Sequence, residues 1–170
     1  MTTIAGTITE DKIVLSSDSR TSGGWSYKRI DSNMNFGKLV KGPDFILAWS
    51  GDCSESTLMQ LFCKDHSIGS GGKLRVIEWL LEFAEWKEGK CDSGQKISNQ
   101  YLLGHKSGLY RINGTAVYEM QGFATAGSGG EFAFTALYLG KSLKKAMEVS
   151  CELDPYSDLP IKTLELGLEK

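Results

Sequence analysis

Short apolar segments separated by polar turns come first along the chain. Residues 2–9 alternate apolar and small positions, and residues 13–17 and 45–49 are compact apolar runs. Runs of about four to eight such residues are typical of β-strands, and an uninterrupted apolar run indicates a strand buried on both faces. Residues 21–36 are polar and contain a Gly-Gly pair, which predicts a long hairpin or loop.

A helical pattern follows. Asp52 or Ser54 is suited to cap a helix whose apolar face is predicted to carry Leu58, Leu61 and Phe62. Residues 69–72 predict a flexible loop. A second helix is expected over residues 73–88, because apolar residues recur there at helical spacing. Its predicted stripe comprises Leu74, Ile77, Leu80, Leu81 and Ala84.

The second half repeats this order of strands and then helices. Short strands are predicted at 101–103, 108–112 and 116–118, with a hairpin turn at Asn113-Gly114. The remaining expected elements are helices over residues 130–139 and 142–153 and a last strand over 161–166. Blocks of strands alternating with blocks of helices indicate an α+β fold, and two stacked sheets with helix pairs outside fit that order.

Composition narrows the class of protein. The chain has 170 residues, 41% hydrophobic and 24% charged, and a formal net charge of −2. These values suit one globular domain over residues 1–170, and they do not favour nucleic acid or an anionic membrane as a partner. The N-terminus lacks the pattern of a signal peptide, and no apolar run is long enough to cross a bilayer, so a cytoplasmic location is expected.

Motifs of several enzyme classes are missing. The two histidines, His66 and His105, lie in no nucleophile motif, and the chain lacks Gly-x-Ser-x-Gly, a phosphate loop and His-Glu-x-x-His. The four cysteines have no metal-ligand spacing and are expected to stay reduced as core or surface residues. No metal or organic cofactor is implied.

Thr2 is the remaining candidate nucleophile. A small residue after Met1 allows an aminopeptidase to remove the methionine, which leaves a hydroxyl and a free α-amine on one residue. The amine can serve as the general base for the hydroxyl, because its ordinary pKa of about 7.7 to 8.0 lies near the operating pH. By itself a Met-Thr start is weak evidence, since most such starts are simply processed termini.

Further segments strengthen this interpretation. They are TTIAG at 2–6, VLSSDSRT at 14–21, FILAWSG at 45–51, AGSGG at 126–130 and DPYS at 154–157. In this order the segments resemble the proteasome β-subunit and HslV-type family of N-terminal-threonine peptidases, over essentially the whole chain. The resemblance implies a four-layer αββα sandwich, the N-terminal-nucleophile (Ntn) hydrolase fold. No propeptide or appended domain is expected.

The resemblance also implies roles for individual residues. Thr2 would be the nucleophile, and Asp18 would orient a lysine; a turn carboxylate is the alternative for Asp18. Gly51 would donate its N–H to the oxyanion, unless it is an ordinary turn glycine. The other implied catalytic residues are Ser128, beside the threonine amine, and Asp154 and Ser157, behind the terminus; helix caps and turns are their alternatives. The implied substrate-binding residues are Arg20, Thr21 and Trp49, and Trp49 could instead be a core residue.

The family lysine is the uncertain position. Lys38, in Gly37-Lys38-Leu39, matches it best, although residues 21–36 make the preceding hairpin longer than usual and Gly37 replaces the usual residue. Its ammonium would lower the pKa of the α-amine. Lys28 is the substitute, and a solvated strand-end lysine is the alternative for Lys38. The chain also departs from the family after Ser157, where Asp158-Leu159 replaces Gly-Gly.

The predicted function is therefore hydrolysis of peptide bonds through an acyl-enzyme on Thr2. The resemblance implies a homo-oligomeric ring, peptide or unfolded-protein substrates and an ATP-dependent unfoldase as a possible partner. Two alternatives remain open. One is a catalytically inactive structural subunit of the same ring, and the other is an Ntn amidohydrolase that acts on small amides.

Overall fold

A computed structural model describes residues 1–21, 37–90 and 94–168. The strands are β1 (Thr3–Ile8), β2 (Lys12–Ser17), β3 (Leu39–Lys41), β4 (Phe45–Ser50), β5 (Gln100–His105), β6 (Gly108–Asn113), β7 (Ala116–Met120), β8 (Phe123–Gly127) and β9 (Lys162–Gly167). The helices are α1 (Cys53–Asp65), α2 (Gly72–Lys87), α3 (Gly130–Tyr138) and α4 (Leu143–Leu153).

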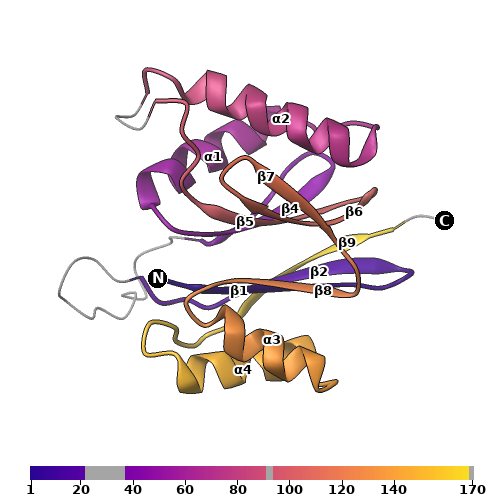
Figure 1. Ribbon diagram of the computed structural model, residues 1–170, viewed down its shortest axis with the longest axis vertical. Coiled ribbons are helices and arrows are strands. Elements are labelled where there is room, and N and C mark those ends of the chain that lie inside the picture. The colour runs from indigo at the N-terminus through magenta and orange to yellow at the C-terminus, as the bar shows by residue number, and fades with distance from the viewer. Residues whose placement is uncertain (22–36, 91–93, 169–170) are drawn as a thin grey trace.

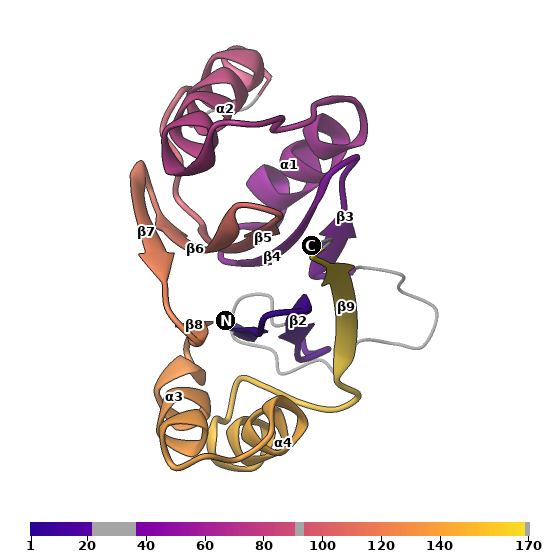
Figure 2. The same ribbon diagram turned by 90° about the vertical axis from the view of Figure 1, so that its right-hand side faces the viewer.

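The elements form four layers. One sheet has the strand order β8-β1-β2-β9 and the other β3-β4-β5-β6-β7, with antiparallel neighbours throughout. The two sheets stack face to face, with α1 and α2 outside the five-stranded sheet and α3 and α4 outside the four-stranded sheet (Figure 1). The turned view shows the same layers (Figure 2). This arrangement confirms the predicted αββα sandwich.

Strand β4 shows why its sequence is apolar at almost every position. Phe45, Leu47 and Trp49 pack in the cluster under α1 and α2, whereas Ile46 and Ala48 pack in the cluster between the two sheets. Successive side chains of a strand point to opposite faces, so a strand covered on both faces needs apolar residues on both. A third, smaller cluster lies under α3 and α4 and contains Ala133, Ala146 and Met147.

The apolar faces predicted for the first two helices were partly wrong. Asp52 caps α1 as predicted, accepting a hydrogen bond from the N–H of Glu55, but Leu61 is exposed. In α2 the predicted Leu74 and Leu81 are exposed as well. The residues that α2 buries are Val76, Trp79, Leu80, Phe83, Ala84 and Lys87. Adjacent leucines such as Leu80 and Leu81 cannot both face the sheet, and the aromatic residues decided which side of the helix does.

Two strands were missed. β3 has only three residues, and β8 reads FATAG, whose small residues and glycine resemble a turn. β8 nevertheless pairs with β1 from Thr3↔Gly127 to Thr7↔Phe123. The hairpin at Asn113-Gly114 is confirmed by the pairing of Asn113 with Ala116.

Other expectations concern parts of the chain that the figures draw in grey. The predicted long hairpin over 21–36 lies outside the described residues except for Thr21, and Lys28 lies there too.

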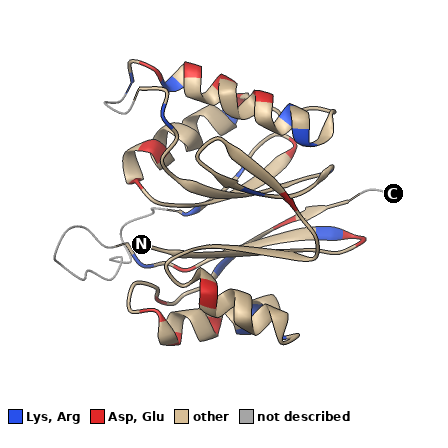
Figure 3. Cartoon of the chain, viewed as in Figure 1, with Lys and Arg blue, Asp and Glu red and all other residues tan. Residues whose placement is uncertain are grey.

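Of the cysteines, Cys63 is buried, Cys151 is partly buried and Cys53 is exposed. Charged residues lie mostly on the helices and loops, with fewer on the strands (Figure 3). No described helix is long and apolar enough to span a membrane.

Candidate active site

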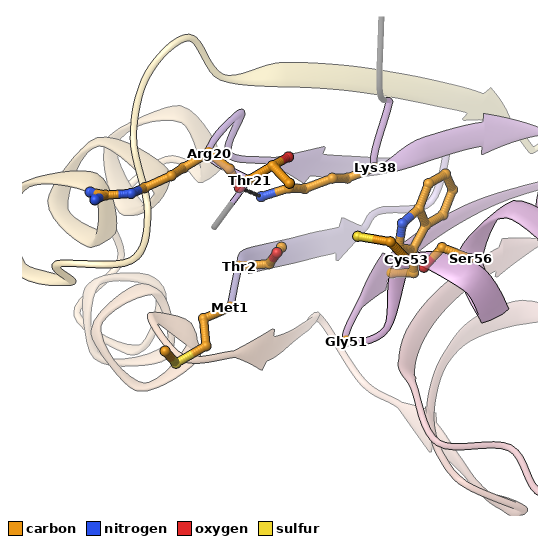
Figure 4. A pocket seen from close by; sticks show the side chains of 9 residues that line it. Met1, Thr2, Arg20, Thr21, Lys38, Gly51, Cys53 and Ser56 are labelled. Carbon is orange, nitrogen blue, oxygen red and sulfur yellow. Dashed lines mark hydrogen bonds between the residues drawn. The ribbon is translucent and has the colours of Figure 1, made fainter. Parts of the chain in front are cut away.

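Thr2 lies at one end of the space between the sheets, immediately before β1. It is 6% exposed, and β1 continues between β2 and β8. Met1 precedes it, so the nitrogen of Thr2 is here part of a peptide bond. Thr2 lines a small cavity of about 30 Å³ with residues of four other segments (Figure 4). The cavity is lined by Met1, Thr2, Arg20, Thr21, Lys38, Trp49, Gly51, Cys53 and Ser56.

Asp18 and Lys38 form a buried ion pair beside this cavity. The Lys38 Nζ lies 2.7 Å from Asp18 Oδ1, and their side chains are 5% and 0% exposed. Lys38 also donates a hydrogen bond to the Arg20 carbonyl oxygen at 2.5 Å. The ammonium and the Thr2 side chain therefore line one cavity (Figure 4). The extra length of the preceding segment in the sequence does not keep Lys38 away from the site.

Backbone amides hold Asp18 in place. Its Oδ1 accepts the N–H of Thr3 at 3.0 Å, and its Oδ2 accepts the N–H of Arg20 at 2.8 Å and that of Asp158 at 3.3 Å. The carboxylate thus joins the residue after Thr2 to the end of β2 and to the segment before β9. Asp18 is both the turn carboxylate and the partner of the lysine, which the sequence interpretation had treated as alternatives.

Burial lowers the pKa of the Lys38 ammonium below its ordinary value of 10.5, while the Asp18 carboxylate acts in the opposite direction. Removing water from a charged amine disfavours its protonated form, and a neighbouring negative charge favours it. Lys38 lies just before β3. Its backbone is held by β4, because Trp49 donates its N–H to the Lys38 carbonyl oxygen at 3.2 Å.

A second hydrogen-bond network lies behind β1. Ser128 Oγ donates to Asp154 Oδ2 at 2.8 Å, and Ser157 Oγ donates to the same oxygen at 2.6 Å. Ser157 Oγ is also 2.7 Å from the hydroxyl of Thr3, and Ser128 Oγ is 3.5 Å from the Thr2 carbonyl oxygen. The three predicted residues therefore meet at the start of β1. Ser128 does not cap α3, whose N-cap is Gly129.

Gly51 forms the corner between β4 and α1, next to Thr2. Its φ of 140° is one that residues with a side chain rarely adopt. Its N–H makes no hydrogen bond with any residue of the described ranges. An amide that is free to donate, in the wall of the cavity that contains Thr2, has the chemistry required of an oxyanion donor.

The three predicted substrate-binding residues all line the cavity, in different ways. Trp49 is 2% exposed, and it both lines the cavity and belongs to the core under α1 and α2. The Arg20 side chain extends away from Thr2, whereas its backbone carbonyl oxygen binds Lys38 (Figure 4). Thr21, next to Arg20 in the chain, also lines the cavity.

The sequence interpretation missed other residues at the site. Cys53 and Ser56, in the first two turns of α1, line the cavity. Asn99 contacts the Gly51 corner, and Gln100 contacts Gly127. Neither amide belongs to a motif or to an apolar pattern, so no local signal indicated them. Among the described residues no group of acidic, histidine and cysteine side chains is arranged to hold a metal ion.

Comparison with known proteins gives matches in structure alone. Thiobacillus denitrificans BPH in complex with epoxomicin has a TM-score of 0.85 and 18% identity, covering 99% of this chain and 100% of that one. A second structure of Thiobacillus denitrificans BPH has a TM-score of 0.83 and 18% identity, covering 98% of each chain. Eukaryotic HslV from Trypanosoma brucei has a TM-score of 0.74 and 19% identity, covering 97% of this chain and 99% of that one.

No protein-family model matches the chain, and no curated protein matches it. The structural matches nevertheless extend over almost the full length of both partners. They confirm, at the level of the fold, the resemblance drawn from the sequence. This chain has the Ntn-hydrolase fold of the HslV- and proteasome-type peptidases.

Proposed function

We propose that this chain is a threonine-type endopeptidase subunit that hydrolyses peptide bonds through Thr2 once Met1 is removed. The observation that carries the proposal is the buried Asp18–Lys38 pair at 2.7 Å, whose ammonium lines the same cavity as Thr2. Burying a cation costs several kcal/mol of desolvation free energy, so a buried lysine calls for a functional explanation. A neighbouring nucleophile that must lose a proton provides that explanation.

Removal of Met1 turns the Thr2 nitrogen into a free α-amine. The amine accepts the proton of the Thr2 hydroxyl as Oγ attacks the carbonyl carbon of the substrate. The Lys38 ammonium favours the neutral, proton-accepting form of this amine and stabilises the oxygen as it becomes negative. Asp18 keeps the ammonium in place.

The tetrahedral intermediate then collapses. Its oxyanion accepts a hydrogen bond from the Gly51 N–H, and loss of one such donor typically costs about 3 kcal/mol in the transition state. The α-ammonium returns its proton to the leaving nitrogen, the C–N bond breaks, and an ester on Thr2 Oγ remains. Water, deprotonated by the same amine, hydrolyses the ester and releases a carboxylic acid.

The rest of the proposal concerns substrates and assembly. Peptides or unfolded polypeptides are the proposed substrates, because the chain shares the fold of the HslV- and proteasome-type peptidases. We propose a closed homo-oligomeric ring, which exposed leucines and aromatic residues on α1, α2 and α3 support. An ATP-dependent unfoldase would supply unfolded chains to such a ring.

Substitution of Thr2 tests the chemistry. We expect Thr2→Ala to abolish peptidase activity without changing the fold, and Thr2→Ser to retain part of it, because serine keeps both hydroxyl and amine. Epoxomicin, which is bound in one of the structural neighbours, should add its mass to the N-terminal peptide of the native protein but not to that of Thr2→Ala. Activity on fluorogenic peptides and intact mass are the measurements.

Three results would contradict the proposal. Activity that survives Thr2→Ala would exclude Thr2 as the nucleophile, and complete retention of Met1 in native material would leave no free amine. An assembled ring that cleaves no peptide and binds no inhibitor would identify a structural subunit. Thr3→Ser is the matched control and should keep activity. It makes the same exchange at the neighbouring threonine, whose hydroxyl bonds Ser157 instead of facing the cavity.

A further inference from the structure

We propose that Asn99 and Gln100 are positioning residues that set the gap between the Gly51 amide and Thr2. The inference rests on the proposed function and extends it to two residues that no motif indicates. Asn99 immediately precedes β5 and Gln100 is its first residue, and each side chain contacts a different glycine corner beside Thr2. We call these two side chains the amide clamp.

Asn99 binds the corner after β4. Its Oδ1 accepts the N–H of Asp52 at 2.5 Å, and its Nδ2 donates to the Asp52 carbonyl oxygen and to Ser56 Oγ, both at 2.9 Å. Asn99 is fully buried. One side chain thus fixes both the donor and the acceptor of the residue that follows Gly51, at the start of α1.

The contact with Gly51 itself is close. A Cβ placed on Gly51 would lie 2.1 Å from Asn99 Oδ1, which is far inside any allowed separation. The corner therefore rests directly against the Asn99 amide. A shift of that amide would therefore press on the Gly51 corner or open a gap beside it.

Gln100 binds the opposite side of the site. Its Oε1 accepts the N–H of Gly127, the last residue of β8, at 3.0 Å. A Cβ on Gly127 would lie 1.9 Å from the Thr2 carbonyl oxygen, so Gly127 in turn rests against Thr2. Two consecutive side chains therefore connect Gly51, on one sheet, with the strand next to Thr2, on the other.

The clamp has its own buried support. Glu55 in α1 accepts the N–H groups of Ser98 and Asn99 at 2.8 and 3.0 Å, and the Tyr101 hydroxyl at 2.7 Å. Burial and the Glu55 charge raise the pKa of Tyr101, which keeps it a donor. The buried Lys87 of α2 lies 3.8 Å from Glu55 and donates to the Lys96 carbonyl oxygen.

None of these groups touches the reacting atoms. Their effect is to hold the backbone of residues 98–100 in one register, so that both amides keep their geometry. An oxyanion donor must lie where the negative charge develops, and a misplacement of about 1 Å can cost about a hundredfold in rate. The clamp should therefore act on the chemical step more than on substrate binding.

Truncation and conservative exchange of each amide test this role. In the assembled protein with Met1 removed, we expect Asn99→Ala and Gln100→Ala each to lower kcat at least about tenfold, while KM changes less than about twofold. Asn99→Asp and Gln100→Glu keep the accepting oxygen and should recover part of the loss. Gln121→Ala, which truncates an exposed glutamine in the turn before β8, is the matched control and should leave kcat unchanged.

Amide hydrogen exchange gives a readout that does not depend on activity. Loss of the accepting oxygen should speed exchange of the Asp52 amide in Asn99→Ala and of the Gly127 amide in Gln100→Ala, while the interior of β2 keeps its protection. Wild-type kcat, or unchanged exchange at these two amides, in correctly folded variants would overturn the clamp. Should the alanine variants fail to fold, Asn99→Leu and Gln100→Met, which keep much of the side-chain volume but lack the accepting oxygen, decide by the same two measurements.

The proposed function can fail separately. Activity in Thr2→Ala would refute the proposed chemistry, and unchanged exchange would refute the clamp whatever Thr2 does. An inactive Thr2→Ala together with wild-type kcat in both alanine variants would refute the clamp alone.

Discussion

Two opposing effects act on the pKa of Lys38. Its ammonium is buried in the cavity wall with Thr2, which lowers its pKa, and the close Asp18 carboxylate is the main effect in the opposite direction. Because the folded chain binds this proton less tightly than the unfolded chain, the charged lysine lowers stability at neutral pH. The cost falls as pH rises through the lowered pKa towards 10.5. A destabilising cation at this place is consistent with the proposed role in catalysis.

The lysine can be tested at the residue scale. We expect Lys38→Ala to lower kcat by about 10²-fold or more, because the amine loses its neighbouring cation and the developing charge loses support. The effect should not add to that of Thr2→Ala, since the groups act as a unit. The native enzyme should also lose activity at alkaline pH, with a midpoint below 10.5, as Lys38 becomes neutral. Steady-state rates across pH measure both.

Two other lysines provide comparisons. Lys41→Ala removes an exposed lysine from β3, the strand that follows Lys38, and should leave the rate unchanged. Lys28→Ala should also have little effect, and Lys28 lies outside the described residues. Activity lost in Lys28→Ala but kept in Lys38→Ala would preserve the threonine mechanism and assign its cation to Lys28.

At the scale of elements, the turn from β8 into α3 brings the backbone of Gly127 close to Thr2. Gly127 has a φ of 89°, and a Cβ there would lie 1.9 Å from the Thr2 carbonyl oxygen and 2.9 Å from Ser50 Oγ. A side chain at this position requires both a strained backbone and displacement of β1. The glycine therefore sets how closely β8 approaches Thr2.

We expect Gly127→Ala to lower the free energy of unfolding by at least about 2 kcal/mol and to abolish activity, because strain and overpacking add. Gly140→Ala is the matched control. Gly140 has a similar φ of 76°, but its Cβ would meet nothing within 4 Å, so only the backbone strain of about 1 kcal/mol should appear. Denaturant unfolding compares the two, and equal losses would show that the approach to Thr2 is not tight.

At the scale of the whole molecule, apolar side chains remain on the outer helical layers. Leu74 and Tyr138 are 73% and 75% exposed, on α2 and α3 respectively. Further exposed apolar residues are Leu61, Leu81, Phe132, Phe134 and Leu139. Exposed apolar residues that gather on one helix indicate a contact surface, whereas scattered ones are ordinary.

We therefore expect the protein to assemble. Light scattering at micromolar concentration should give a mass of at least six times the 18.6 kDa subunit. Tyr138→Ser with Leu139→Ser should shift the protein towards smaller species without unfolding it, because α3 then loses apolar contact area. Lys144→Ser, on the neighbouring α4, is the control. A mass of 18.6 kDa at every concentration would exclude the ring.

The amino-acid sequence alone determined the order of strands and helices apart from β3 and β8, and it indicated several of the residues that meet at Thr2. Local patterns sufficed there, because an apolar run or a helix cap depends on neighbours along the chain. Motifs in the expected order also identified Asp18, Ser128, Asp154 and Ser157, and the structure places all four around the start of β1.

Only the tertiary structure showed that Lys38 lines the same cavity as Thr2. The length of the hairpin left Lys28 and Lys38 open in the sequence, since spacing along a loop does not fix where its ends lie in space. The pairing of β3 with β4 brings Lys38 to Asp18. The same holds for Leu74 and Leu81, whose exposure depends on which side of α2 the aromatic residues turn to the sheet.

The amide clamp is the clearest case of tertiary control. Asn99 follows no pattern in its own segment, yet its partners lie 47 and 43 residues away along the chain. Gln100 reaches a partner 27 residues away, on the other sheet. Such contacts arise when two sheets stack, and the physical reason is that a buried amide must find its hydrogen bonds wherever the fold brings a partner.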